Sequence, residues 1–307
     1  MMGRLSRRSL LLQSAAALTL GATLGAIGTP LLATQGAEYG IAYLESLGRP
    51  GALRDGMAFI PPSQIDEAYS HVLYVNTSTS GGGGQKMWVL ERRDRQSEST
   101  QTASLDFGAD LVRALGQGKG DWRVAIHDPG YWARRGLPPG AEPPYSWPVS
   151  TGRHYPGDRR SGPTPLGIFN VDDRNHRHRR GWGSPGMYNS IYIDLHYSSG
   201  RASGVAMHGT TGGMYSRLGR ADSHGCIRMT QTNADQIWAM FHPGGAKGAG
   251  SPLWGEVPRY FSSAPAEGYQ SRHGYVRDGS FLYDSSGQSR LMKNGYTALF
   301  IFFRDDL

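Results

Sequence analysis

Residues 206–229 of this 307-residue chain read AMHGTTGGMYSRLGRADSHGCIRM. The stretch contains the only cysteine of the chain, Cys226, with His208 eighteen positions upstream and Arg228 two positions downstream. A single cysteine cannot form an internal disulfide, and an unpaired thiol is ordinarily a small buried hydrophobe. The reactive groups around Cys226 favour the other interpretation, which is a nucleophile.

A thiol attacks a carbonyl only as thiolate, so Cys226 needs a base and a positive environment. His208 is the candidate base. Gly209 follows it, and its carbonyl is free to accept from Nδ1–H of the imidazole, which would fix the tautomer as a carboxylate does in other triads. His224 lies two residues before the cysteine, an awkward place for a base in an extended or turned segment. We therefore expect its backbone, rather than its ring, to contribute.

Gly225 allows a sharp turn directly before the cysteine. The backbone N–H groups of Gly225 and Cys226, with that of His224, are candidates for binding the developing oxyanion. In an extended segment Arg228 shares the face of Cys226. There it can lower the thiol pKa, bind a substrate carboxylate or hold loops in place, and a structural ion pair is the plain alternative. We assign supporting or substrate-binding roles to Arg228, His224, Ser223 and Tyr188.

The rest of the chain predicts a mostly β protein, because short aromatic and β-branched runs alternate with clusters of Gly, Pro, Ser and Asn. The expected strands are 71–76, 85–91, 122–127, 168–171, 188–197 and 205–209, and 274–283 is expected to pair with 296–304. Short helices are expected at 39–47, 106–115 and 233–241, the last with Thr232 as N-cap, and Ser63 is expected to cap a helical turn.

These patterns divide the chain into four parts. Residues 1–37 predict an export signal, since Arg7 and Arg8 precede an apolar run and resemble a twin-arginine signal. That run is just long enough for an uncleaved anchor, the only membrane contact we expect. Residues 38–70 form an N-terminal lead-in that packs on the main domain. Residues 71–241 form the main domain, which holds the catalytic candidates, and residues 242–307 form a C-terminal β extension.

The charge composition limits which kinds of molecule the protein is expected to bind. The net charge is +7, of which three charges belong to arginines of the leader. The remaining bias of about +4 (7 − 3) suits a polyanionic envelope polymer. No basic face interleaved with aromatic residues recurs, so nucleic acid is not expected. Residues 172–182 (DDRNHRHRRGW) are either a solvated loop or a mobile basic flap that attracts substrate carboxylates. His176 and His178 have no nearby ligands that complete a convincing metal site.

The residues around His208 and Cys226 resemble the motif of a known enzyme family. His208 and Gly209, followed at the right spacing by Ser223-His224-Gly225-Cys226, resemble the signature of the YkuD-type L,D-transpeptidases. The segments VSTG (149–152) and TPLGIF (164–169) resemble two further landmarks of that domain, in the expected order. The resemblance covers about 71–241.

The resemblance implies a YkuD-like β-sandwich with the catalytic cysteine in a cleft under a flap. Cys226 would attack the carbonyl of the third residue, a diamino acid, of a peptidoglycan stem peptide. D-Alanine would leave, and an amine of a neighbouring stem would take the acyl group from the thioester. His208 would be the base, Gly209 would orient it, and Arg228 would support the site. The implied enzyme needs no cofactor and works in the periplasm or cell wall.

Three alternatives stay open. Water as acceptor would make the protein an L,D-carboxypeptidase, and the long 172–189 insert leaves room for a non-standard amine acceptor. His208, His224 and Cys226 could instead ligate zinc, although no fourth ligand is evident. A wall-binding module without catalysis is the third reading, and the intact reactive set argues against it.

Overall fold

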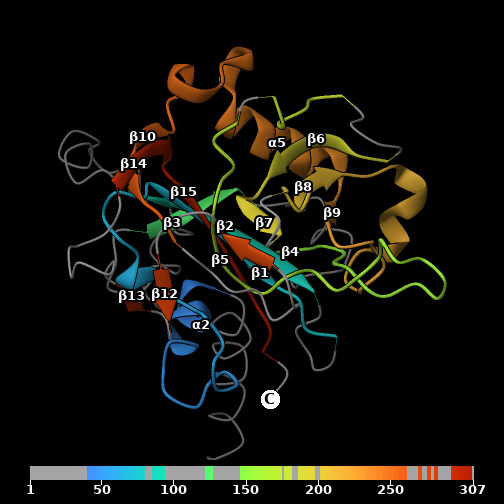
Figure 1. The fold of residues 1–307 in the computed structure, drawn as a ribbon, viewed down its shortest axis with the longest axis horizontal. Helices are drawn as coiled ribbons and strands as arrows, with labels where there is room; N and C mark the ends of the chain where they lie inside the picture. Colours follow the sequence, from blue (N-terminus) through green and yellow to red (C-terminus); the bar gives the residue numbers. More distant parts are fainter. Residues whose placement is uncertain are drawn as a thin grey trace, which may run out of the picture.

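The computed structural model describes residues 40–79, 85–93, 122–126, 146–174, 176–181, 186–197, 201–260, 269–271, 275–277, 280–282 and 292–305. Two stacked sheets form its centre (Figure 1). The main sheet has the order β3-β2-β1-β15-β5, with β4 paired to β2. Its strands are β1 (His71–Asn76), β2 (Lys86–Arg92), β3 (Trp122–Ile126), β4 (Trp147–Pro148), β5 (Gly167–Asn170) and β15 (Ala298–Phe303).

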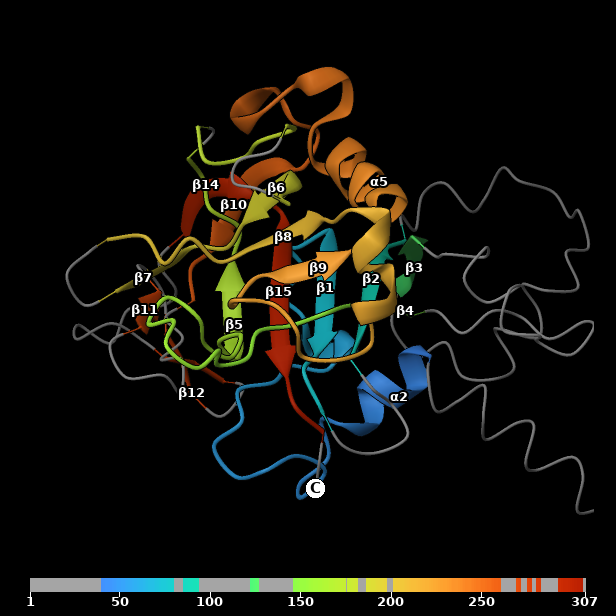
Figure 2. The same ribbon diagram turned by 90° about the vertical axis from the view of Figure 1, so that its right-hand side faces the viewer.

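The second sheet has the order β6-β8-β9 and carries the sequence stretch that was singled out first. Its strands are β6 (Tyr188–Tyr192), β8 (Ala206–Gly209) and β9 (Ile227–Met229). In Figure 2 these strands cross those of the main sheet, and helix α5 (Gln231–Phe241) lies beside them. The mostly β, sandwich-like fold that the sequence predicted is confirmed.

Smaller elements surround the two sheets. Three further strand pairs are β10 (Trp254–Pro258) with β14 (Met292–Tyr296), β7 (Leu195–Tyr197) with β11 (Tyr269–Ser271), and β12 (Tyr275–Arg277) with β13 (Ser280–Leu282). Helix α2 is Ile41–Ser46, and the 3-10 turns are η1 (Pro62–Gln64), η3 (Gly212–Arg217), η4 (Pro243–Gly245) and η5 (Gly248–Gly250).

Strand β15 occupies the centre of the main sheet. It runs parallel to β1, with His71 opposite Ala298, and antiparallel to β5. All six of its residues are buried, because both faces of this sheet are covered. Phe300 and Phe302 face the second sheet, whereas Leu299 and Ile301 face the lead-in. The last strand thus completes the sheet that the 71–76 strand begins.

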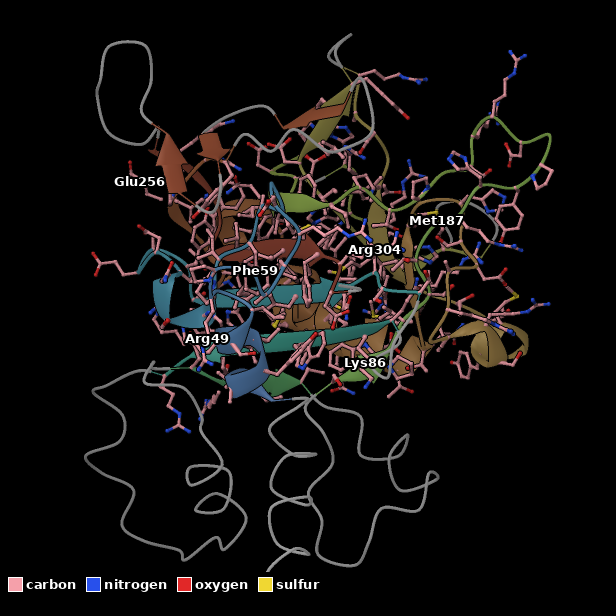
Figure 3. The ribbon with its side chains drawn as sticks, turned by 90° about the horizontal axis from the view of Figure 1, so that it is seen from below. Arg49, Phe59, Lys86, Met187, Glu256 and Arg304 are labelled. Carbon is pink, nitrogen blue, oxygen red and sulfur yellow. The ribbon has the colours of Figure 1, made fainter. Side chains whose placement is uncertain are left out.

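Two apolar cores result from this alternation. The inner core lies between the sheets and includes Val75, Phe300, Met207 and Ile227. The outer core lies under the lead-in, where Leu44 of α2 and Phe59 pack on the other face of the main sheet. Figure 3 looks onto this side, with Phe59 over the strands and Glu256 at the periphery. The described residues of the lead-in therefore pack on the main domain.

Several sequence-based details are wrong. The described strands of 274–283, β12 and β13, pair with each other and not with 296–304, where β15 pairs with β1 and β5. The expected strand 188–197 is divided into β6 and β7. Helix α5 begins two residues early, and its N-cap is Thr230, whose hydroxyl accepts from Asn233 N–H at 3.2 Å. Thr232 is thus inside the helix.

The predicted turn after Pro61 is present, but Pro61 occupies its N-cap position and Ser63 lies inside it. The Ser63 hydroxyl and backbone N–H both bond the Glu45 carboxylate of α2, at 2.7 and 2.6 Å. The predicted helix 106–115 and the export signal 1–37 lie outside the described residues.

Candidate active site

The parallel pairing of β8 with β9 decides on which face of the second sheet His208 and Cys226 lie. Met207 lies opposite Ile227 and His208 opposite Arg228, so Ala206 lies level with Cys226 at the start of the ladder. Met207 and Ile227 point into the inner core. Their neighbours alternate to the opposite face of the sheet. His208, Cys226 and Arg228 therefore share that face, which we call the site face.

His208 is held in one tautomer. Its Nδ1 lies 2.8 Å from the carbonyl oxygen of Gly209, and a carbonyl can only accept, so Nδ1 carries the proton. Burial lowers the pKa of His208 to about 4; hydrogen bonding with the backbone of Gly209 and Gly186 opposes this, and the charge of Arg228 adds to it. The imidazole is thus neutral at pH 7, with Nε2 able to accept a proton.

Cys226 is a neutral thiol at rest. Its Sγ–H donates to the carbonyl oxygen of Gly204 at 3.7 Å. Burial raises the pKa of the Cys226 thiol, and a backbone hydrogen bond with Ala206 and the charges of Arg228 and Arg177 oppose the rise. Thiolate formation therefore requires that the proton pass to a neighbouring base, and His208 is on the same face.

The turn before the cysteine is tightly built. Gly225 has φ +139°, a value that L side chains rarely adopt. Its N–H donates to the Ser223 hydroxyl at 3.1 Å, and that hydroxyl donates to the Cys226 carbonyl oxygen. The Gly225 amide is thus engaged within the turn, which leaves those of His224 and Cys226 as the oxyanion-binding candidates.

The two landmark segments support this turn from below. The Thr164 hydroxyl accepts from Gly152 N–H and donates to the Gly225 carbonyl oxygen, each at 2.8 Å. A Cβ at Gly152 would lie 2.6 Å from Gly225 Cα and 2.2 Å from the Gly162 carbonyl oxygen. Only glycine permits this approach. The VSTG and TPLGIF segments are therefore parts of the cysteine scaffold.

The other predicted residues take different positions. Arg228 donates through Nη1 to the Asp222 carbonyl oxygen at 2.7 Å, so it holds the loop that precedes the cysteine. The His224 ring is exposed, stacks on Tyr155 and lies 3.2 Å from the Asp158 carboxylate. Its ring contacts are therefore with residues 155 and 158 of the preceding loop. Tyr188 lies opposite Gly209 in the β6–β8 pairing and is half-buried.

Close packing is a second reason for a glycine at position 209, in addition to the bond that its carbonyl accepts from His208. A Cβ there would meet Ala234 Cβ at 3.1 Å and Gln231 Cα at 3.3 Å. Helix α5 packs directly on β8 at this point. The helix therefore fixes the end of the strand that carries His208.

Sequence reasoning missed Tyr192 and did not single out Arg177 from its basic segment. Tyr192 lies opposite Ala206, so Tyr192, Ala206 and Cys226 form a row across the site face. The Arg177 guanidinium lies 4.5 Å above the Tyr192 ring. The alternation of Tyr192 with the buried Ile191 and Ile193 was the available signal for the tyrosine. No signal in the sequence indicated the contact between Tyr192 and Arg177.

The described residues of the basic segment do not form a fully solvated loop. Asp172 and His178 are buried, and the His178 ring nitrogen Nδ1 lies 2.8 Å from Nε2 of His242. His176 is exposed. No group of three or more metal-ligating side chains occurs in the described part of the chain. The set His208, His224 and Cys226 is thus not assembled there as a zinc site.

A thiol and a neutral, carbonyl-held imidazole on one face of a sheet in a β-sandwich are groups suited to acyl transfer. Residues 137–248 match the family model YkuD, described as the L,D-transpeptidase catalytic domain. This family comprises L,D-transpeptidases, which are acyltransferases that act on peptidoglycan peptides. The match contains the whole second sheet and every candidate site residue, but not β1, β2 or β15. No curated protein matches the chain.

Among the helices that the structure describes, none is both long and apolar enough to cross a membrane.

Proposed function

We propose that this protein is an exported peptidoglycan L,D-transpeptidase with Cys226 as its nucleophile and His208 as its general base. The observation that carries the proposal is the β8–β9 register, which sets both side chains on one face while Gly209 holds Nδ1 of His208. The family match at 137–248 supports the substrate class, which is the stem peptides of peptidoglycan as donor and acceptor.

The first half-reaction cleaves the donor. The thiol proton passes to Nε2 of His208 as Sγ of Cys226 bonds to the carbonyl carbon of the third stem residue. The amides of His224 and Cys226 are the candidates that stabilise the oxyanion of the tetrahedral intermediate. When the intermediate collapses, the imidazolium gives its proton to the nitrogen of D-alanine. The products are D-alanine and a thioester on Cys226.

The second half-reaction runs the same steps with an acceptor amine. The amine attacks the thioester carbon and loses a proton to Nε2, and Sγ leaves and takes the proton back. One amide bond replaces another, so no external energy source is required. Arg228 takes part by holding the 222–226 loop through the Asp222 carbonyl, and its charge favours the thiolate.

The molecule that accepts the acyl group from the thioester decides which of two reactions the enzyme catalyses. With water, the same site is an L,D-carboxypeptidase, and another amine would give a different cross-link. The test is to incubate purified protein with disaccharide-tetrapeptide and analyse the products by mass spectrometry. We expect cross-linked dimers and free D-alanine. Tripeptide without dimers would identify the carboxypeptidase, and unchanged substrate would refute both activities.

The nucleophile is tested separately by intact mass after incubation with a carbapenem. We expect one adduct on the parent protein and none on the Cys226→Ala variant. Cys226→Ser is the matched control for size, because a hydroxyl replaces the thiol without opening a cavity. An adduct on Cys226→Ala would contradict the assignment, since the chain has only this cysteine.

A further inference from the structure

The segment 172–181, which we call the arginine loop, is fastened to the second sheet near the site. It follows Val171, which bridges to Ile193, and its Arg179 bridges to Ser190 with two backbone hydrogen bonds of 3.1 and 2.7 Å. The bridged residues flank Tyr192 in sequence. The loop is therefore held on both sides of that tyrosine, and Arg177 comes from the span between the anchors.

Arg177 lies at one end of the row that ends in the nucleophile. Its guanidinium carbon is 4.5 Å above the Tyr192 ring. In the strand pairing, Ala206 is the residue between Tyr192 and Cys226. Neighbouring strands lie about 4.8 Å apart, so the Tyr192 and Cys226 backbones are separated by roughly 10 Å. One peptide residue of a substrate spans about 3.5 Å, which fits within that width.

Two arginines of the loop share one buried carboxylate, that of Asp172, and they use it differently. Arg174 uses Nε and Nη2 to bond both oxygens of the buried Asp172, at 3.0 and 2.9 Å, and its Nη2 also lies 3.0 Å from Nε2 of His196. Asp194 stands on the far side of that histidine. Arg177 bonds the same Asp172 through Nη1 alone, at 2.6 Å.

A guanidinium has five N–H donors, so a single bond leaves most of the Arg177 fork unused. The side chain keeps 11% of its surface exposed. Its charge reaches the site, because it is one of the charges that lower the pKa of the Cys226 thiol. Tyr192 and Asp172 thus hold the Arg177 cation at the Tyr192 end of the row, with several of its N–H donors unused.

We propose that Arg177 binds a carboxylate that the acyl donor carries close to the carbon attacked by Cys226. The ligand chemistry follows from the planar fork, which matches a carboxylate with two parallel hydrogen bonds. This inference rests on the proposed function for the identity of the donor. Two carboxylates qualify, namely that of the departing D-residue and a side-chain carboxylate on the third stem residue.

The first experiment needs no stem peptide. Iodoacetate and iodoacetamide alkylate a thiol by the same displacement of iodide, but only iodoacetate carries a carboxylate next to the reacting carbon. The ratio of their rates at Cys226 cancels any change in the thiolate fraction. We expect Arg177→Gln to lower the iodoacetate/iodoacetamide ratio about tenfold. Arg177→Lys, which keeps the charge without the fork, should lower it less.

The matched control is Arg180→Gln, which removes an exposed arginine of the same loop and should leave the ratio within about twofold. An unchanged ratio in a folded Arg177→Gln variant overturns the proposal, and so does an equal fall in Arg180→Gln. Thermal melting checks the fold. If Arg177→Gln does not fold, Arg177→Lys decides the question, and an unchanged ratio there overturns the proposal.

The second experiment identifies the carboxylate. Donor tetrapeptides are prepared with either the terminal or the side-chain carboxylate amidated, and kcat/KM is compared between the parent and Arg177→Gln. The donor whose amidation abolishes the difference between the two proteins carries the ligand. A difference that survives both amidations overturns the proposal. If no stem peptide is turned over, the proposed function fails, whereas the alkylation ratio still tests Arg177.

Discussion

Replacing Gly152 by alanine should damage the candidate site without touching a reactive group. The added Cβ would lie 2.2 Å from the Gly162 carbonyl oxygen, 2.6 Å from Gly225 Cα and 2.7 Å from Gly225 N. Contacts under 3.0 Å are essentially never seen, so the closest pair must separate by at least 0.8 Å (3.0 − 2.2). All three contacts are backbone atoms, which cannot rotate aside.

Part of the displacement falls on Gly225, directly before Cys226, whose Cα must move away by at least 0.4 Å (3.0 − 2.6). Overpacking of this kind costs about 1–3 kcal/mol of unfolding free energy. A shift of about 1 Å in a reacting group can cost roughly 100-fold in rate. We therefore expect Gly152→Ala to lower both the melting temperature and the turnover of disaccharide-tetrapeptide, with the larger effect on turnover.

The matched control is Gly162→Ala in the same cluster. A Cβ at Gly162 meets only the His154 ring, at an ordinary 3.8 Å. Urea denaturation gives the stability change, and alkylation of Cys226 by iodoacetamide reports the thiol environment without a substrate. Gly152→Ala with parent-like stability and alkylation would refute the steric argument, as would equal damage in both variants.

Three further predictions follow from the described contacts. Burial lowers the pKa of His178 to about 3 and that of His242 to about 4. As the pH falls below about 6.5, these histidines bind protons in the unfolded chain but not in the folded one, which favours unfolding. Stability should fall between about pH 6.5 and 4, and thermal melts at pH 7 and 4.5 should show a loss on the order of 5 kcal/mol, about half from each histidine, that is smaller in His178→Gln. An equal loss in the two proteins would contradict this. Thr164→Val leaves the Gly152 amide and the Gly225 carbonyl without a partner and should cost about 1–3 kcal/mol in urea denaturation, whereas Thr164→Ser should cost less. A chain ending at Thr297 lacks β15 and should show no cooperative thermal unfolding by circular dichroism, and a cooperative transition would show that the strand is dispensable.

Much of the candidate site was accessible from the sequence because its members are close along the chain. Gly209 directly follows His208, so a bond from Nδ1 to the next carbonyl is a local event. The turn before Cys226 is also local, and a glycine there predicts the positive φ that Gly225 adopts. The residues within the turn were predicted less well, because the same glycine N–H serves either an oxyanion or the Ser223 hydroxyl.

The basic segment shows where local reasoning fails. Its arginines and histidines look alike in sequence, yet Arg177 lies on Tyr192, Arg180 is exposed and His178 is buried against His242. Each outcome depends on a partner that comes from another part of the chain. Burial and charge pairing are therefore properties of the assembled fold, and spacing along the sequence does not reveal them.

The sequence by itself determined the mostly β class, the nucleophile and base candidates and the short helix that packs on β8, since each rests on residue type or local periodicity. Only the tertiary structure decided the strand order. Strand β15 pairs with β1 across more than 220 residues, as His71 opposite Ala298 shows, and it forms the centre of the main sheet. A buried apolar run has no polar alternation to indicate its neighbours. Its place is fixed by packing against two cores at once, and that packing exists only when both sheets have formed.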